Sequence, residues 1–128
     1  ANGKALVHVP EQLKDDRDII YTAIEQSGTA IRYLTCNEWL SDRELIKMAV
    51  GQDGHSLRYL HDNFRNDREI VLLAVRQNGI CLEYASDELR NDYDIVMTAV
   101  TQTGEALYEA SQELQNNRNI VMVAVSSY

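Results

Sequence analysis

The segment "NDREIVLLAVRQNG", which runs from Asn66 to Gly79, decides the fold because the chain repeats it. Close copies are "DDRDIIYTAIEQSG" at 15–28, "SDRELIKMAVGQDG" at 41–54 and "NDYDIVMTAVTQTG" at 91–104, and a fifth copy, "NNRNIVMVAVSSY", occupies 116–128. The glycines that close successive copies are 25 or 26 residues apart. A period of this length is typical of solenoids, in which short supersecondary units stack on one another.

Within each copy the apolar residues have helical spacing. Ile70, Val71, Ala74 and Val75 fall at i, i+1, i+4 and i+5, which is one stripe on an α-helix. The stripe has a small residue at its centre in every copy, namely Ala23, Ala49, Ala74, Ala99 and Ala124. Because alanine lets a neighbouring helix approach closely, the pattern predicts helix–helix contact at this position.

Both ends of this long helix carry sequence signals. The first residue of each copy is a good N-cap, namely Asp15, Ser41, Asn66, Asn91 and Asn116. Ser41 together with Glu44 fits a capping box. The closing glycine is expected to adopt the left-handed conformation that ends many helices. A long helix of about 12 residues is therefore predicted in each copy.

A second motif follows each glycine. Its copies are "ALVHV" (5–9), "AIRYL" (30–34), "SLRYL" (56–60), "CLEYA" (81–85) and "ALYEA" (106–110). The spacing predicts a short helix, followed by an apolar anchor at Leu13, Trp39, Phe64, Leu89 or Leu114. One such pair of helices buries too little apolar surface to offset its conformational entropy, so it needs neighbours.

The sequence thus predicts an all-α fold, an α-solenoid of about five 25-residue helical hairpins that each join a long and a short helix. Residues 1–128 should form a single repeat domain, which we expect to be a segment of a larger repeat protein or to be cut from one at repeat boundaries.

Composition narrows the classes of partner. Twelve basic and twenty acidic residues give a net charge of −8, which disfavours nucleic acid. No apolar run approaches the roughly 20 residues that span a bilayer, so no membrane partner is expected. Two cysteines, Cys36 and Cys81, form no disulfide framework and favour a reducing compartment. We expect a cytoplasmic location, or delivery into a host cell if the source is a bacterium.

The pattern "NDREIVLLAVRQNG…LEYASDELRND" resembles the tandem repeat catalogued as domain of unknown function 4116. The resemblance covers almost the whole chain, with departures at His8 and Glu109, where the other three copies have Tyr33, Tyr59 and Tyr84. It implies helical repeats that bind protein. It supplies no reaction and no functional residues.

Most polar residues recur once per repeat, whereas an active site is a set of reactive residues that occurs once in a chain. We therefore predict no catalytic residue, no cofactor and no metal site; His8, His55 and His61 lack metal-ligand spacing. The arginine series Arg17, Arg43, Arg68 and Arg118 either ties each repeat to its neighbour or binds an external carboxylate or phosphate. Cys81 occupies an alanine position and is expected in the core, whereas Cys36 is expected in an exposed joint.

One row varies between copies and is our candidate partner-binding surface. It follows each Ile-Val pair and consists of Tyr21, Lys47, Leu72, Met97 and Met122, with Arg76 four residues after Leu72. Varied side chains on a fixed scaffold, with two adaptable methionines, suit protein binding. The alternative is that Leu72, Met97 and Met122 pack one repeat against the next. Trp39 is either a core anchor or a further binding residue.

The functional hypothesis is a non-enzymatic scaffold for protein–protein interaction. One alternative is a regulatory inhibitor that blocks a partner enzyme, for example a bacterial effector; another is an accessory repeat segment of a larger enzyme. The six consecutive apolar residues from Ile120 to Val125 also suggest a homo-oligomer formed through uncapped end helices.

Overall fold

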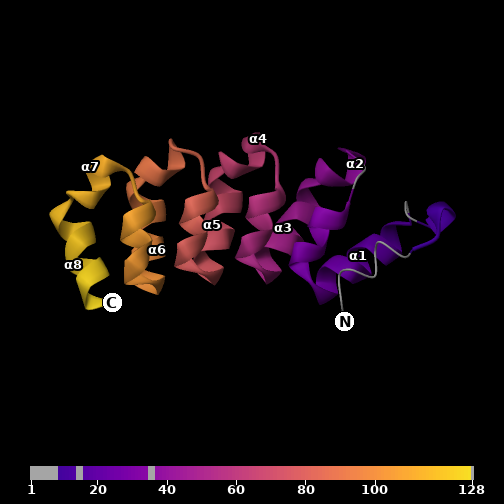
Figure 1. Cartoon of the computed structure of the whole chain (residues 1–128), viewed down its shortest axis with the longest axis horizontal. Coiled ribbons are helices and arrows are strands. Elements are labelled where there is room, and N and C mark those ends of the chain that lie inside the picture. Colours follow the sequence, from indigo (N-terminus) through magenta and orange to yellow (C-terminus); the bar gives the residue numbers. More distant parts are fainter. Residues whose placement is uncertain (1–8, 14–15, 35–36, 128) are drawn as a thin grey trace.

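The protein is a row of stacked helices. The computed structural model describes residues 9–13, 16–34 and 37–127, and the regular elements within these ranges are all helical. The long helices lie side by side from α1 to α8, with short helices along one edge of the row (Figure 1). The main contacts join elements of the same repeat or of adjacent repeats. The predicted all-α repeat fold is confirmed.

Some predictions fall outside the described residues. They concern the N-cap at Asp15, the joint residue Cys36, and His8 with most of the motif at 5–9. Within the described ranges, no helix is long and apolar enough to cross a membrane.

The predicted stripe lies on the core side of the long helices and is fully buried in α3, α5 and α6. The long helices are α1 (Arg17–Gln26), α3 (Arg43–Gln52), α5 (Arg68–Gln77), α6 (Tyr93–Gln102) and α8 (Arg118–Ser126). In α5, Ile70, Val71, Ala74 and Val75 are all 0% exposed, and α3 and α6 bury the same four positions as completely. Each helix spans nine or ten residues rather than the predicted 12.

The N-caps predicted at Ser41, Asn66, Asn91 and Asn116 are wrong by one residue. The caps are Asp16, Asp42, Asp67, Asp92 and Asn117. Asp67, for example, accepts a hydrogen bond from the Ile70 backbone N–H at 3.2 Å. Asn66 instead accepts a hydrogen bond from the Ser86 hydroxyl of the next repeat. Asn66 and Asp67 are both residue types that cap helices well. Asn66 is used by the hydrogen bond with Ser86, and Asp67 caps the helix.

The capping box predicted for Ser41 and Glu44 is wrong for the same reason. Asp42 caps α3, with its Oδ1 accepting from the backbone N–H groups of Glu44 at 3.1 Å and Leu45 at 3.3 Å. Ser41 is exposed and lies before the cap.

The closing glycines also have a different role from the predicted one. No described glycine has a positive φ. The residue before each glycine is extended, as at Asn78 with φ −157°, and the glycine then begins a 3-10 helix. Glycine is required for space: a Cβ on Gly54 would lie 2.7 Å from the carbonyl oxygen of Ala74 in the next long helix. Gly28 and Gly79 approach Ala49 and Ala99 in the same way.

Each repeat contains a third, short element that the sequence analysis did not predict. The predicted short helices are 3-10 helices, η3 (Gly28–Tyr33), η4 (Gly54–Tyr59), η5 (Gly79–Tyr84) and η7 (Gly104–Glu109). Each is followed by a further turn of helix, and the two residues that join η4 to its turn, Leu60 and His61, are both extended. These turns are α2 (Asn37–Leu40), α4 (Asp62–Arg65), η6 (Leu89–Asn91) and α7 (Gln112–Gln115).

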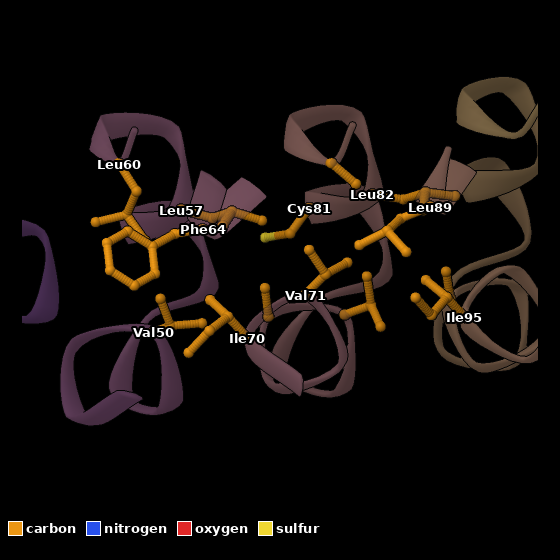
Figure 2. Packing of buried hydrophobic residues seen from close by; sticks show 14 of the residues in the cluster. Val50, Leu57, Leu60, Phe64, Ile70, Val71, Cys81, Leu82, Leu89 and Ile95 are labelled. Atoms are coloured by element: carbon orange, nitrogen blue, oxygen red, sulfur yellow. The ribbon is translucent and has the colours of Figure 1, made fainter. Parts of the chain in front are cut away.

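The core lies between the long helices and the 3-10 helices. In Figure 2, Ile70 and Val71 from α5 face Leu57 from η4 and Cys81 and Leu82 from η5. The anchors Trp39, Phe64, Leu89 and Leu114 close the core and are at most 9% exposed. Leu13, in η2 (Glu11–Leu13), is 41% exposed, so its predicted role as an anchor is wrong.

Candidate partner-binding surface

The arginine series ties α1 to α3, α3 to α5 and α5 to α6. From α5, Arg68 donates through Nε to Asp92 Oδ2 at 3.0 Å and through Nη2 to Asp94 Oδ2 at 3.2 Å. From α3, Arg43 binds both carboxylate oxygens of Asp67 and donates to Glu69 Oε2 at 2.8 Å. We call this series of arginines and carboxylates the carboxylate ladder.

The ladder reaches the carboxylates that cap the helices. The hydrogen bond from Arg43 holds the pKa of Asp67 below its usual value, against the opposing effect of partial burial. Asp67 therefore stays ionised while it caps α5 and accepts from Arg43, so one side chain ends a helix and joins two repeats.

Two residues of the predicted binding row belong to this ladder. Arg17 donates to the Tyr21 hydroxyl at 2.9 Å, and that hydroxyl donates to Asp42 Oδ2 at 2.9 Å. Burial and the hydrogen bond to Asp42 raise the pKa of Tyr21. Lys47 Nζ lies 2.9 Å from Glu69 Oε1. Tyr21 and Lys47 are thus bound to the following repeat.

The remainder of the row is apolar and half-exposed. Leu72 and Met97 are partly buried and pack against the core, whereas Met122 is 55% exposed. Arg76 is exposed and has no hydrogen bond or ion pair to the described residues. The row therefore changes along the stack. In α1 and α3 its side chains are polar and bound to the next repeat, whereas in α5, α6 and α8 they are apolar.

Trp39 lies in the core. It is 8% exposed, and its indole Nε1 has no hydrogen-bond partner among the described residues. The ring therefore packs from α2 onto the core as an apolar anchor, and little of it reaches the surface. Its role as a binding residue stays a prediction.

A second set of contacts joins the repeats through their backbones. Gln77 donates through its side-chain amide to the carbonyl of Gly51, and Gln52 does the same to Glu25. At the opposite edge, Arg65 Nε donates to the Tyr84 carbonyl at 2.6 Å. The side-chain amides and guanidinium groups that recur once per repeat thus serve the stack.

Arg65 and Arg90 are residues that the sequence analysis missed. They are one period apart, which was the available signal. Both line an open, polar hollow between α4 and the joint that follows η5, beside Glu83 and Glu88. Arg90 binds the Glu109 carboxylate at 3.3 Å, so its charge is satisfied internally.

The 3-10 helices carry an arginine–tyrosine cluster that was also missed. The Arg32 guanidinium lies 4.7 Å from the ring centre of Tyr33 and 5.8 Å from that of Tyr59, and donates to the Tyr59 hydroxyl at 3.2 Å. The signal was the recurring Arg-Tyr pair at 32–33 and 58–59. Arg32 joins η3 to η4 and lies on the opposite side of the core from the row.

The described ranges contain no group of three or more His, Cys, Asp or Glu side chains that could hold a metal ion. His55 is paired through Nδ1 with Asp53 at 3.1 Å and lies edge-on to Tyr84. Cys81 is buried, and burial raises the pKa of its thiol to about 12. A thiol with this pKa is a poor nucleophile at neutral pH.

Comparison with known proteins identifies the repeat. The family described as Domain of unknown function (DUF4116) matches four segments, at residues 1–40, 42–90, 68–114 and 92–128, of which the last three overlap in succession. The chain belongs to this family. The overlapping matches confirm that the family unit occurs in tandem along the chain. Searches of curated proteins and of solved structures gave no match.

Proposed function

We propose that the protein is a non-enzymatic scaffold that binds another protein along the apolar part of the row, at Leu72, Met97 and Met122, with Arg76 at its edge. The change from polar to apolar side chains along the row supports this proposal. At the same position α1 and α3 have side chains bound to the next repeat, whereas α5, α6 and α8 have apolar side chains with water-exposed surface. Such a strip on a rigid scaffold suits a partner helix or strand of apolar character.

The absence of an enzymatic role is part of the same proposal. The ladder arginines Arg43 and Arg68, the amides and the joint residue Arg65 are each engaged in holding adjacent repeats together. A catalytic group has to be available to a substrate, and these groups are engaged by neighbouring repeats.

The hydroxyls that follow the row are used locally. Thr101 and Ser126 donate to the carbonyls of Met97 and Met122 in their own helices, at 2.7 and 2.9 Å. They offer a partner no free donor, so affinity has to come from apolar contact and from Arg76. A buried thiol is compatible with a cytoplasmic location, which belongs to this proposal.

The test uses the two most exposed members of the surface, so that folding is preserved. Met122→Asp and Arg76→Glu are combined, and affinity is measured by titration calorimetry against a partner recovered from cells of the source organism. We expect the double variant to weaken binding at least tenfold, because it places two negative charges on an apolar contact. Arg58→Glu, on the 3-10 helix side, is the matched charge control.

Unchanged affinity in the double variant, with circular dichroism equal to wild type, would remove the row from consideration. A partner that proves to be an enzyme, and that loses activity on binding, would favour the regulatory inhibitor over the scaffold. The two roles share one surface and differ in the consequence of binding.

A further inference from the structure

Two arginines on the 3-10 helices carry positive charge that no described carboxylate balances. Arg32 lies in the last turn of η3 and Arg58 at the same place in η4, and both are exposed. Arg32 donates to the hydroxyls of Tyr33 and Tyr59, and Arg58 makes no hydrogen bond or ion pair with the described residues. By contrast, most described arginines form an ion pair with a carboxylate of the chain, namely Arg17, Arg43, Arg65, Arg68 and Arg90.

The two guanidinium groups share one aromatic ring. The Cζ atoms of Arg32 and Arg58 each lie 5.8 Å from the ring centre of Tyr59. Arg32 also lies 4.7 Å from the ring centre of Tyr33. Because guanidinium groups stack on aromatic faces, the tyrosines hold both arginines in place without supplying a negative charge. Two like charges at one ring repel each other, and an anion bound between them would relieve this repulsion.

The arginines are not needed to form the 3-10 helices. A basic residue in the last turn of a helix interacts favourably with the free carbonyls there. However, η5 and η7 have the same length of six residues with Glu83 and Tyr108 at the arginine position. The pair of arginines is therefore a local feature of η3 and η4 and not a requirement of the repeat.

The chain itself shows how its arginines bind carboxylates. Arg68 in the carboxylate ladder binds two acids that are two residues apart, Asp92 and Asp94. The planar guanidinium group pairs with such acceptors through several N–H groups at once. Arg32 gives one N–H from each terminal nitrogen to a tyrosine, which leaves its Nε–H and one N–H on each terminal nitrogen for a further acceptor. Arg58 has all its N–H groups available.

We propose that η3 and η4 form a docking surface for an acidic peptide segment of another protein, whose Asp or Glu carboxylates bind Arg32 and Arg58. The charge of the surface complements such a segment, and Tyr33 and Tyr59 hold the guanidinium groups ready for it. Nucleic acid is disfavoured, because its affinity rests on many phosphate contacts and the net charge of −8 repels a long polyanion. The surface lies on the opposite side of the core from the row and does not depend on the function proposed above.

The test is an NMR titration of the full, 15N-labelled chain with a peptide of about ten residues in which Asp alternates with Gly. We expect the peptide to shift the backbone amides of η3 and η4 and the Nε–H signals of Arg32 and Arg58. The matched peptide with Asn in place of Asp should leave these signals unchanged, because it carries no charge. Added salt should weaken the binding of the Asp peptide.

Variants identify the arginines that bind. Arg58→Gln should weaken binding about fivefold or more, since a charge-assisted hydrogen bond is lost, and Arg32→Gln combined with Arg58→Gln should abolish the shifts. Arg58 makes no hydrogen bond with the described residues, so the single variant keeps the fold. The matched control is Arg76→Gln, on the opposite side of the core, where an exposed arginine equally lacks an ion pair to the described residues. Circular dichroism verifies that each variant is folded.

Three results would overturn the proposal. They are no shifts with the Asp peptide at millimolar concentration, equal shifts with the Asn peptide, and binding that Arg76→Gln weakens as much as Arg58→Gln does. Tighter binding of an oligouridylate of about ten nucleotides at the same residues would assign the surface to nucleic acid and overturn it as well. A failure here leaves the row untouched, because the Asp-Gly peptide has no apolar side chain to bind there. In the calorimetric test above, a partner that loses affinity with Arg58→Glu and not with the double variant would support this surface.

Discussion

The interior repeats and the end repeats have nearly the same apolar pattern but not the same burial. The helix face "IVLLAV" of α5 lies between two neighbours, and its four stripe residues are 0% exposed. The face "IVMVAV" of α8 has one neighbour, and Val125 in the same stripe is 67% exposed. The apolar face of a long helix is therefore buried by the adjacent repeats. The free energy of unfolding of a repeat depends on its position in the stack.

The largest expected effect concerns the close approach between repeats. Gly79→Ala should lower the free energy of unfolding by about 3 kcal/mol, because the added Cβ would collide with the backbone carbonyl of Ala99, which cannot rotate away. Urea denaturation followed by circular dichroism measures the change.

A second glycine gives the matched control. Gly51 lies inside α3, and a Cβ there would meet no atom within 4 Å. Gly51→Ala should stabilise the protein by about 0.5–1 kcal/mol, since alanine is the better helix former. If both variants changed stability equally, the close-packing role of the repeat glycines would be wrong.

A pair of valines tests the comparison directly. Val100→Ala should cost about 2 kcal/mol, since two fully buried methyl groups are lost and a cavity remains. Val125→Ala, at the equivalent position of α8, should change the free energy of unfolding by less than about 0.5 kcal/mol because its side chain is exposed. Thermal and urea denaturation of both variants give the difference, and equal costs would contradict the dependence on neighbours.

The ladder predicts a smaller effect that depends on pH. Arg43→Gln should lower the free energy of unfolding slightly at pH 7, because solvent screens partly exposed ion pairs. Arg43 lowers the pKa of Asp67 in the folded state, so its contribution is present above the pKa of the unfolded chain and is lost as pH falls through the lower folded value. Arg43→Gln should therefore lose less stability than wild type between pH 5 and pH 3.

The control for the ladder is Arg118, which has no partner among the described residues. At concentrations where the chain is monomeric, Arg118→Gln should leave both the free energy of unfolding and its pH dependence close to wild type. A pH profile of Arg43→Gln that matches that of Arg118→Gln would show that the ladder contributes nothing measurable.

The smallest expected effect is chemical. In a Cys36→Ser background Cys81 is the remaining thiol, and burial raises its pKa to about 12. We expect no reaction with a disulfide reagent at pH 8 until denaturant is added, when one thiol per chain should react. Reaction of the native protein at the rate of a free thiol would show that the interior of the stack opens readily.

Much of the fold could be predicted because the repeat displays its core five times. The stripe Ile70, Val71, Ala74 and Val75 emerges from spacing alone, and the need for neighbours follows from how little one pair of helices can bury. The glycine role could not be predicted in the same way. Sequence indicates that Gly79 has to be glycine but does not distinguish a requirement for positive φ from a requirement for space.

The candidate site was less predictable. Tyr21 and Lys47 were grouped with Leu72 because all three share one position in the repeat. Their partners, Asp42 and Glu69, lie in the next long helix and are brought close only by stacking. A variable row thus contains both side chains that join repeats and side chains that remain exposed, and only the contacts between repeats separate the two.

Native-state hydrogen exchange, resolved for each long helix by NMR at a concentration where the chain is monomeric, tests the central claim most directly. If each repeat depends on its neighbours, the opening free energies of backbone amides should be highest in α5 and α6 and lower in α8. Amides of α8 as strongly protected as those of α5 would contradict the account.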